Sequence, residues 1–457
     1  MMEKLKNHTD VLIFQFRVCV RAANSESQSR IKVFLRKTLK FSTRAIAVNC
    51  SDMEENMIQI AVLGYGTVGS GVVEVIETNK ADINKKAAAQ LEVKYILDLR
   101  DFPGDPYESK VIHDYNTILN DPEVTIICET MGGTKPAYDF TKQALLLGKS
   151  VCTSNKELVA AHGPELLKIA REKHCNYLFE ASVGGGIPII RPLNYSLTAE
   201  HIDGITGILN GTTNYILTKM DKEGVDFDEV LKEAQDKGYA ERNPEADVEG
   251  YDACRKIAIL SSLMSGKNVN YEDIYTEGIT KISSADFKYA KQMNKSVKLL
   301  ALSRDTEDGF FAMVAPFLIS KEHPLYSVNG VFNAVYVHGN MLGDSMYYGR
   351  GAGKLPTASA VVSDVVDCAR HQGKTIMCFW DEEKVEVADI KRARRKFFVR
   401  VPVDKREAAM GAFGALAEVN VGIAEEFAFM TQEMTEAEFD EKIERTGGCL
   451  NRIRMMA

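Results

Sequence analysis

The chain has 457 residues, a length that is typical of two or three domains. Its 45% hydrophobic and 26% charged residues are ordinary for a globular protein with a large buried core. The formal net charge of −8 argues against a nucleic-acid partner, because nucleic-acid-binding proteins carry a broad basic face. No apolar run reaches the roughly 18 residues of a membrane helix. We therefore expect a soluble protein without nucleic-acid or membrane partners.

The nine cysteines are scattered singly, with no CxxC pair and no metal-ligand spacing. An odd number without a disulfide framework favours a reducing compartment, where cysteines serve as small hydrophobic residues. We therefore expect a cytoplasmic protein.

Residues 1–56 differ from the rest of the chain because their first 50 positions are rich in Lys and Arg. Part of the segment fits a transit peptide, but Glu3 and Asp10 occur early and no strong amphipathic period is visible. We interpret residues 1–56 as a disordered basic extension, with Met57 as the natural beginning.

From residue 57 the pattern becomes regular and predicts a nucleotide-binding domain over 57–190. The predicted strands are Ile58–Leu63, Val93–Leu97, Val124–Glu129 and Val151–Thr153, and the predicted helices are Ser70–Asn79 and Tyr138–Leu147. Strands that alternate with helices predict an α/β fold with a parallel, doubly wound sheet.

Residues 191–345 have a different texture, which predicts an α+β domain for substrate binding, catalysis and dimerisation. We expect a strand and turn over Thr206–Leu217 and helices over Asp228–Lys237, Asp252–Ser265 and Ala285–Ser303. Alternating segments near Ala312–Phe317 and Val331–Val337 indicate a mixed or antiparallel sheet. A helix over Thr357–His371 follows a glycine-rich turn, and we expect residues 346–375 to return to the nucleotide-binding domain.

The tail, residues 391–457, is predicted to be a small α+β unit. Its expected order is strand Phe397–Val403, helix Arg406–Glu418, strand Ala428–Gln432, helix Glu436–Thr446 and strand Leu450–Met455. This order resembles the regulatory module called ACT, although it is one strand short. Because ACT modules pair across subunits, we expect a homodimer or homotetramer.

The segment from Gly64 to Gly69 is a G-x-G-x-x-G motif that also contains Thr67 and Val68. Alone it is a weak signal, since glycine clusters often mark turns. Here it follows an apolar strand and opens a helix, so Gly66 lets the backbone approach a pyrophosphate and the helix N-terminus offers free N–H groups. The motif therefore predicts a Rossmann-type dinucleotide site.

Asp98, Arg100 and Asp101 stand near the end of the second strand. An acidic group there binds the ribose 2′-hydroxyl of NAD, whereas an arginine accepts the 2′-phosphate of NADP. The sequence offers both, and Arg100 favours NADP slightly.

Three further positions are candidates for cofactor contact. Lys156 follows a parallel strand, and ligands bind beyond the carboxyl ends of such strands, although an exposed lysine is the commoner outcome. Thr130 ends the preceding strand, where a plain turn is the alternative, and Gly351 lies in the glycine-rich turn before Thr357–His371.

Glu180 precedes a glycine-rich loop that contains Val183, Gly185 and Ile187. The backbone carbonyls of such a loop, together with a carboxylate, suit a hard cation. A flexible hinge between domains is an equally good interpretation of the spacing.

The densest group of chemical residues lies between positions 238 and 256. Asp252 and Lys256 are four residues apart and share one face of a helix, and Glu241 and Asp247 add two acids on a loop broken by Gly and Pro. A surface ion pair is the ordinary explanation. The composition, however, favours a pocket for an amino-acid ammonium group beside a lysine that transfers a proton.

Taken together, the motifs resemble those of homoserine dehydrogenases over roughly residues 57–371. The matching segments are IAVLGYGTVGSGV, TSNKELVA, EASVGGGIPII, GILNGTTNYIL, and GYAE followed by DVEGYDACRKIAIL. The resemblance implies reversible reduction of L-aspartate 4-semialdehyde to L-homoserine by NAD(P)H, in the biosynthesis of threonine, methionine and isoleucine.

The resemblance also implies roles for single residues. Lys256 matches the proton donor, Glu241 the contact to the substrate amino group, and Asp247 and Asp252 the acids that line the pocket. Lys156 matches the lysine between cofactor and substrate. Glu180, Val183, Gly185 and Ile187 match a monovalent-cation site, usually sodium.

The sequence departs from the family where Pro-Asp-Pro usually follows the pocket glutamate, because it has Arg242, Asn243 and Pro244 there. Two rival interpretations remain: a Rossmann reductase of another small carbonyl compound, and a non-catalytic sensor of nucleotides and amino acids.

Overall fold

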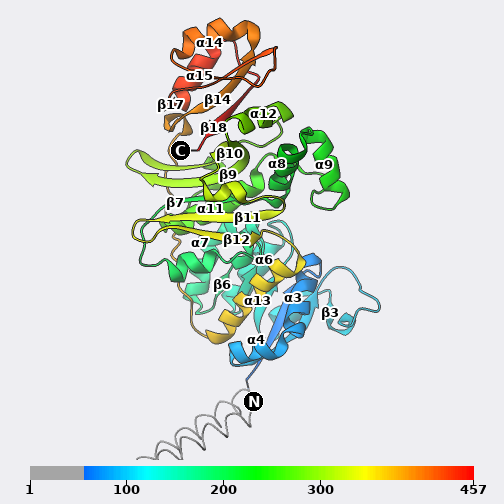
Figure 1. Cartoon of the computed structure of the whole chain (residues 1–457). Coiled ribbons are helices and arrows are strands. Elements are labelled where there is room, and N and C mark those ends of the chain that lie inside the picture. Colours follow the sequence, from blue (N-terminus) through cyan, green and yellow to red (C-terminus); the bar gives the residue numbers. More distant parts are fainter. Residues whose placement is uncertain (1–55, 457) are drawn as a thin grey trace, which may run out of the picture. The chain divides into compact units, whose positions relative to one another are not determined.

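The computed structural model describes residues 56–456 (Figure 1). The expectation of a disordered extension therefore concerns a segment outside the described residues, apart from Asn56. Of two compact units, the larger comprises Ile58–Ala87 and the chain from Leu91 onward, and the site described below lies within it. In the part of the chain that the structure describes, no helix is long and apolar enough to cross a membrane.

A six-stranded sheet has the strand order β3-β2-β1-β4-β5-β6, with parallel registers for β1–β4, β2–β3, β4–β5 and β5–β6. The strands are β1 (Met57–Leu63), β2 (Gln90–Leu97), β3 (Val111–Ile112), β4 (Val124–Glu129), β5 (Ser150–Thr153) and β6 (Tyr177–Leu178). This order is that of a Rossmann fold and confirms the predicted doubly wound sheet.

Helices of this first part are α3 (Thr67–Thr78), α4 (Lys80–Ala87), α5 (Tyr115–Leu119), α6 (Ala137–Leu146) and α7 (Lys156–Glu172). A later helix, α13 (Lys354–Arg370), packs closely on α3, since a methyl group on Gly71 would lie 2.9 Å from the carbonyl oxygen of Lys354. The central strands have apolar residues on both faces because helices cover both sides; Ile60 and Ala61, which point to opposite faces of β1, are completely buried.

The second, ten-stranded sheet is mixed, as predicted, and it runs in the order β12-β11-β7-β9-β10-β18-β14-β16-β15, with β8 paired to β10. Its strands before the tail are β7 (Ile202–Ile208), β8 (Tyr275–Thr276), β9 (Lys295–Thr306), β10 (Gly309–Ser320), β11 (Phe332–Gly339) and β12 (Gly343–Arg350). The helices of this part are α8 (Gly211–Glu223), α9 (Phe227–Asp236), α10 (Glu245–Val248), α11 (Tyr251–Ser265) and α12 (Ser284–Gln292).

Two predicted elements of this part are wrong. The expected strand and turn over Thr206–Leu217 is a strand that ends at Ile208, followed by α8 from Gly211. The expected helix over Ala285–Ser303 ends at Gln292, and the chain from Lys295 is strand β9. Residues 296–303 are buried on both faces of the strand. Apolar and polar residues therefore do not alternate along it, and the period of the sequence cannot distinguish this strand from a helix.

The tail contains strands β14 (Phe397–Pro402), β15 (Ala417–Val419), β16 (Glu426–Met430) and β18 (Asn451–Met455) and helices α14 (Arg406–Phe413) and α15 (Glu436–Arg445). Short strands β13 (Arg394–Arg395) and β17 (Met434–Thr435) pair with each other. The prediction that the tail lacks a strand is wrong, because β15 occupies the end of the expected helix Arg406–Glu418. The resulting order is βαββαβ, and β18 joins the tail to β10 in parallel register.

Candidate active site

The glycine motif lies at the point where the first sheet reverses its order, between β1 and β4. Gly64 follows β1 with a φ of +88°, and its N–H donates to the carbonyl of Leu97 at 2.8 Å. Thr130, which follows β4, donates its hydroxyl to the carbonyls of Leu63 and Gly64 at 2.9 Å. Ligands of open α/β sheets bind at this kind of crevice.

The glycines have different surroundings. A methyl group at Gly69 would lie 1.9 Å from the carbonyl oxygen of Gly64, so the helix can approach the turn only without a side chain there. At Gly66 no atom lies within 4 Å of such a group, which leaves the backbone open to a ligand. Helix α3 begins at Thr67 and Val68 without a side-chain cap, so its first N–H groups are available to an anion.

Asp98 and Arg100 form a paired unit beside this turn. Arg100 Nε lies 3.0 Å from Asp98 Oδ1 and Nη2 lies 3.1 Å from Oδ2, and the N–H of Tyr65 donates to Oδ2 at 2.8 Å. The hydrogen bond from Arg100 is the main cause that holds the pKa of Asp98 well below its usual range. The Arg100 side chain is 63% exposed, so it can still reach a ligand.

Lys156, Asp252 and Lys256 are brought together from two helices. Lys156 is the first residue of α7, and its Nζ lies 3.1 Å from Asp252 Oδ1. Lys256 Nζ donates to Asp252 Oδ2 at 2.7 Å and to the carbonyl of Leu209 at 2.8 Å. Each ammonium group has three N–H bonds, so each lysine retains a donor for a ligand.

The pKa values of this cluster follow from the balance between burial and neighbouring charges. Burial raises the pKa of Asp252, but the charges of Lys256 and Lys156 outweigh it and hold that pKa well below its usual range. The charge of Asp252 in turn raises the pKa of Lys156. Asp252 is thus a carboxylate that orients two cations at the edge of the first sheet.

Asn210 belongs to the same cluster, although it was not among the predicted site residues. Its Nδ2 donates to Asp247 Oδ1 at 2.7 Å and to Asp252 Oδ2 at 2.8 Å, while its Oδ1 accepts from the N–H of Thr213 as the cap of α8. Burial is the largest cause that raises the pKa of Asp247, followed by the charge of Asp252. The GILNGTTNYIL motif contained the signal, but its asparagine had no assigned role.

Glu241 is not brought into this cluster. It is exposed, and no contact within residues 56–456 joins its carboxylate to Asp247, Asp252 or Lys256. The nearby backbone is held by Gln235, which donates to the Glu241 carbonyl at 3.0 Å, and by Thr212, which donates to the Tyr239 carbonyl at 2.7 Å.

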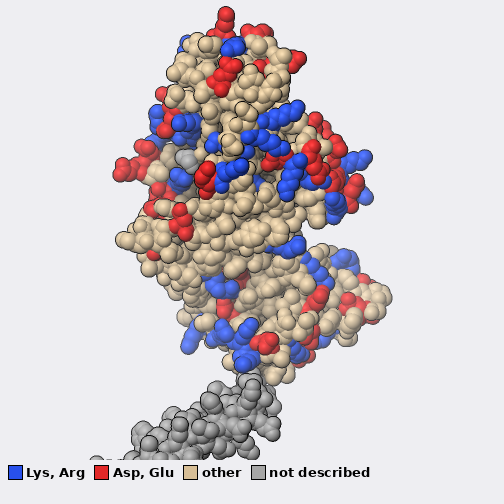
Figure 2. All heavy atoms as spheres, viewed as in Figure 1, with Lys and Arg blue, Asp and Glu red and all other residues tan. Residues whose placement is uncertain are grey.

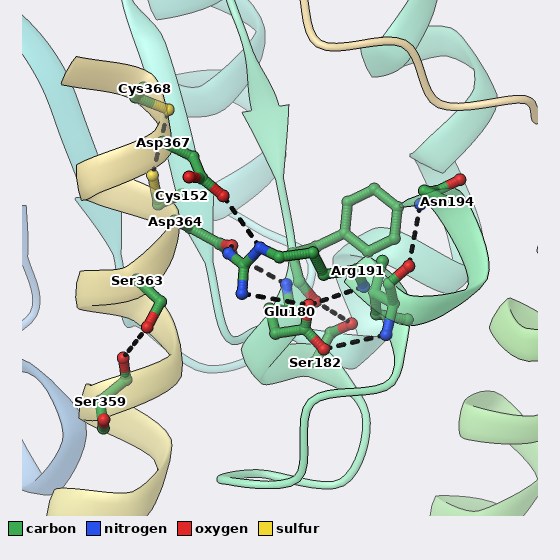
Figure 3. Close-up of polar contacts among 12 residues, drawn as sticks. Cys152, Glu180, Ser182, Arg191, Asn194, Ser359, Ser363, Asp364, Asp367 and Cys368 are labelled. Carbon is green, nitrogen blue, oxygen red and sulfur yellow. Dashed lines mark hydrogen bonds and ion pairs between the residues drawn. The ribbon is translucent and has the colours of Figure 1, made fainter. Parts of the chain in front are cut away.

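The carboxylate of Glu180 is occupied by backbone amides rather than free for a cation. Oε1 accepts from the N–H groups of Ile189 and Ile190 at 2.6 and 2.9 Å, and Oε2 accepts from that of Arg191 at 2.7 Å. Figure 3 shows Arg191 pointing to Asp364 and Asp367 on α13, and the ion pairs measure 2.7 and 2.9 Å. Glu180 therefore fixes the chain that leads into the second part of the molecule.

The loop after Glu180 fits a monovalent cation only through its carbonyls. Within the described residues, the carbonyl oxygens of Val183, Gly185 and Ile187 accept no backbone hydrogen bond, whereas the Gly184 carbonyl accepts from the N–H of Ile187 at 2.9 Å. The described residues contain no cluster of three or more His, Cys, Asp or Glu side chains that could hold a metal.

Gly351 lies against this loop rather than against the glycine motif. A methyl group on Gly185 would lie 2.5 Å from the Gly351 carbonyl oxygen, and one on Gly351 would lie 2.1 Å from the Asn333 side chain. The close approach of the two segments requires glycine at both positions.

Comparisons with known proteins point to one enzyme family. Residues 64–180 match the model of the homoserine dehydrogenase NAD-binding domain, and residues 188–366 match the homoserine dehydrogenase model. The protein is an oxidoreductase with an NAD-binding domain. The homoserine dehydrogenase of Synechocystis is 46% identical over 318 residues, which cover 68% of this chain and 73% of that protein. The chain belongs to the homoserine dehydrogenase family.

Solved structures extend the similarity into the tail. A homoserine dehydrogenase from Thiobacillus denitrificans has a TM-score of 0.80 and 33% identity, and the match covers 88% of this chain and 99% of that one. The Staphylococcus aureus enzyme at pH 7.5 gives a TM-score of 0.73 at 33% identity, with 88% and 99% covered. A hyperthermophilic archaeal homoserine dehydrogenase in complex with NADPH gives 0.59 at 29% identity, with 68% and 97% covered.

Proposed function

We propose that this protein catalyses the reversible NAD(P)H-dependent reduction of L-aspartate 4-semialdehyde to L-homoserine, a step towards threonine, methionine and isoleucine. The observation that carries the proposal is the single carboxylate of Asp252 between Lys156 and Lys256 at the carboxyl edge of the Rossmann sheet. The nicotinamide supplies or accepts the hydride when it is bound.

The roles of the side chains follow from charge. Reduction of the aldehyde places negative charge on its oxygen, so the site needs a positioned cation and a proton. Lys256 provides both, and Asp252 holds it in place. Lys156 lies where the cofactor and substrate meet, while Asp247 and, after movement of its loop, Glu241 receive the substrate ammonium group.

For the cofactor we propose contacts from Gly64, Gly66, Thr67, Val68, Gly69, Thr130, Lys156 and Gly351, with a preference for NADP. The preference rests on Arg100, whose exposed guanidinium can meet a 2′-phosphate, while Asp98 is already paired with Arg100 and the Tyr65 N–H. The NADPH complex of the archaeal relative supports this choice.

We propose a sodium site formed by the backbone carbonyls of Glu180, Val183, Gly185 and Ile187. The unpaired carbonyls of the loop support it, and the occupied Glu180 carboxylate limits its side chain to an indirect role. A ligand of the native state adds stability by mass action, so the melting temperature should be higher in sodium than in tetramethylammonium at equal ionic strength. Identical melting curves in the two buffers would contradict the proposed sodium site.

We also propose a homodimer or homotetramer that pairs through one face of the second sheet. The face carries Met346 and Tyr348 of β12, which are 43% and 52% exposed, and the adjoining turn carries Met341 and Leu342, which are 80% and 60% exposed. Figure 2 shows few charged side chains over β11 and β12, whereas charged residues gather over α8 and α9. An apolar face of this kind favours a second copy of the chain as its partner.

We propose a nucleotide-binding domain at 57–190 with 346–375, a catalytic domain at 191–345, and an ACT-like module at 391–457, for which the βαββαβ order is the support. Free thiols at the described cysteines fit a cytoplasmic location.

The direct test is a spectrophotometric assay of NADP⁺ and NAD⁺ reduction with L-homoserine. We expect turnover with both cofactors, with higher kcat/KM for NADP⁺. Absence of activity with L-homoserine, combined with turnover of another small alcohol, would favour the rival reductase. Cofactor binding without turnover of any such substrate would favour the sensor, although a sensor has no need of the Lys156–Asp252–Lys256 cluster.

A further inference from the structure

A buried ion cluster joins the tail to the catalytic part of the chain. Arg454 of β18 has a side chain only 1% exposed, and its Nη1 lies 2.7 Å from Glu277 Oε2. Its other nitrogens bind both oxygens of Glu436 on α15, at 2.6 and 2.8 Å. Glu277 also accepts from the hydroxyl of Tyr275 at 2.9 Å. Glu277 is the charged member of this cluster that comes from the catalytic part of the chain.

The residues after Glu277 lie directly against the loop that carries the pocket acids. The N–H of Ile279 donates to the Val248 carbonyl at 2.8 Å, and a methyl group on Gly278 would lie 2.2 Å from that oxygen. Thr280 donates to Glu249 Oε1 at 3.0 Å. Val248 and Glu249 lie between Asp247 and Asp252 in the chain, so the position of segment 277–280 determines where these two acids can lie.

We propose that Glu277 is a positioning residue for the amino-acid pocket, because it anchors segment 277–280 to Arg454 of the tail and thereby holds residues 247–252 in place. The inference deepens the proposed function and rests on it. It assigns the tail a direct effect on substrate affinity through contacts within one chain. A ligand or partner that moved β18 would act on the pocket by the same contacts.

The chain contains a matched control for this proposal. Arg400 of β14 also joins the tail to the catalytic part, with Nη1 2.7 Å from Asp286 Oδ1 and Nη2 2.6 Å from Glu426 Oε1. Asp286 is fully buried and, like Glu277, pairs with an arginine of the tail, but it lies on α12. Outside the tail, its carboxylate accepts hydrogen bonds from the N–H and the hydroxyl of Ser283, a residue beyond segment 277–280.

The experiment compares Glu277→Gln with Asp286→Asn in the full-length chain. Both changes weaken a buried ion pair to the tail, so both should lower the melting temperature. We expect only Glu277→Gln to raise KM for L-homoserine, by between about twofold and thirtyfold, with kcat and KM for NADP⁺ nearly unchanged. Arg454→Lys, which keeps the charge, should retain more substrate affinity than Arg454→Met.

A second measurement does not depend on activity. In hydrogen–deuterium exchange, peptides that cover 247–252 should exchange faster in Glu277→Gln than in the parent, and at the parental rate in Asp286→Asn. Equal KM values for the two variants, or equal exchange at 247–252, would overturn the proposal. If the parent protein fails to oxidise homoserine, the proposed function is wrong, and the exchange data still decide whether Glu277 holds the loop.

Discussion

Asp252 and Lys256 share a helix face, and their ion pair follows directly from their spacing of four residues. Lys156 reaches the same carboxylate from α7, a long way back in the sequence, and no local pattern could place it there. Its position after a parallel strand predicts a place near the cofactor crevice, and the resemblance to a family adds the role between cofactor and substrate. Asn210 could not be predicted as a site residue, because an asparagine before a helix is ordinarily only a cap.

Glu129 is a buried acid beneath the cofactor crevice, and it gives a prediction about pH. It is fully buried at the end of β4, and burial raises its pKa from the usual 4.5 to about 7. A raised carboxyl pKa means that the folded state binds a proton that the unfolded state releases between about pH 4.5 and 7. The contribution of Glu129 to stability is therefore present at low pH and is lost as the pH rises through that range.

Glu129→Gln removes this ionisation. We expect its melting temperature, relative to the parent, to be more favourable at pH 8 than at pH 5. Glu123, whose side chain is 68% exposed, provides the control, since Glu123→Gln should shift little between the two pH values. A difference between Glu129→Gln and the parent that stays the same at both pH values would contradict the interpretation.

At the scale of elements, the junction of β1 and α3 separates two roles of glycine. Gly69→Ala places a methyl group 1.9 Å from the Gly64 carbonyl oxygen, so the strand and helix must move apart and the melting temperature should fall. Gly66→Ala meets no atom within 4 Å, so the fold should tolerate it. We expect Gly66→Ala to weaken NADP⁺ binding in a titration, because the methyl group occupies the space through which the pyrophosphate approaches.

The interpretation would be contradicted if Gly66→Ala lowered the melting temperature and Gly69→Ala left it near that of the parent.

The secondary structure of the Rossmann part could be predicted well because its strands and helices alternate and its glycines mark their junctions. Residues 211–217 could not, since Thr and Asn favour strand and turn, yet Asn210 caps a helix there that buries Ile216, Leu217 and Met220. Strand β9 depends on pairing with β10 along its whole length. Pairing of that kind is tertiary information, which the period of a single segment does not contain.

At the scale of the whole molecule, the exposed apolar face of β12 predicts association. Light scattering should give a mass of two or more chains. Met346→Glu places a charge on that face and should shift the mass towards one chain, because a buried unpaired charge opposes association. Met377 is similarly exposed, at 50% against 43% for Met346, so Met377→Glu is the control and should leave the mass unchanged.

If the parent protein is monomeric at all concentrations, the proposed interface on the second sheet is wrong.

We propose that Lys256 exchanges a proton with the substrate oxygen while other residues form the cofactor site. The measurement is kcat for L-homoserine in Lys256→Ala, together with the Kd for NADP⁺; Lys267→Ala, a change outside the pocket, is the control. We expect kcat to fall by about 10²–10⁴, as for loss of a general acid or base, with the NADP⁺ Kd nearly unchanged. A kcat close to that of the parent would contradict the account, because the pocket would then work without the residue around which it is built.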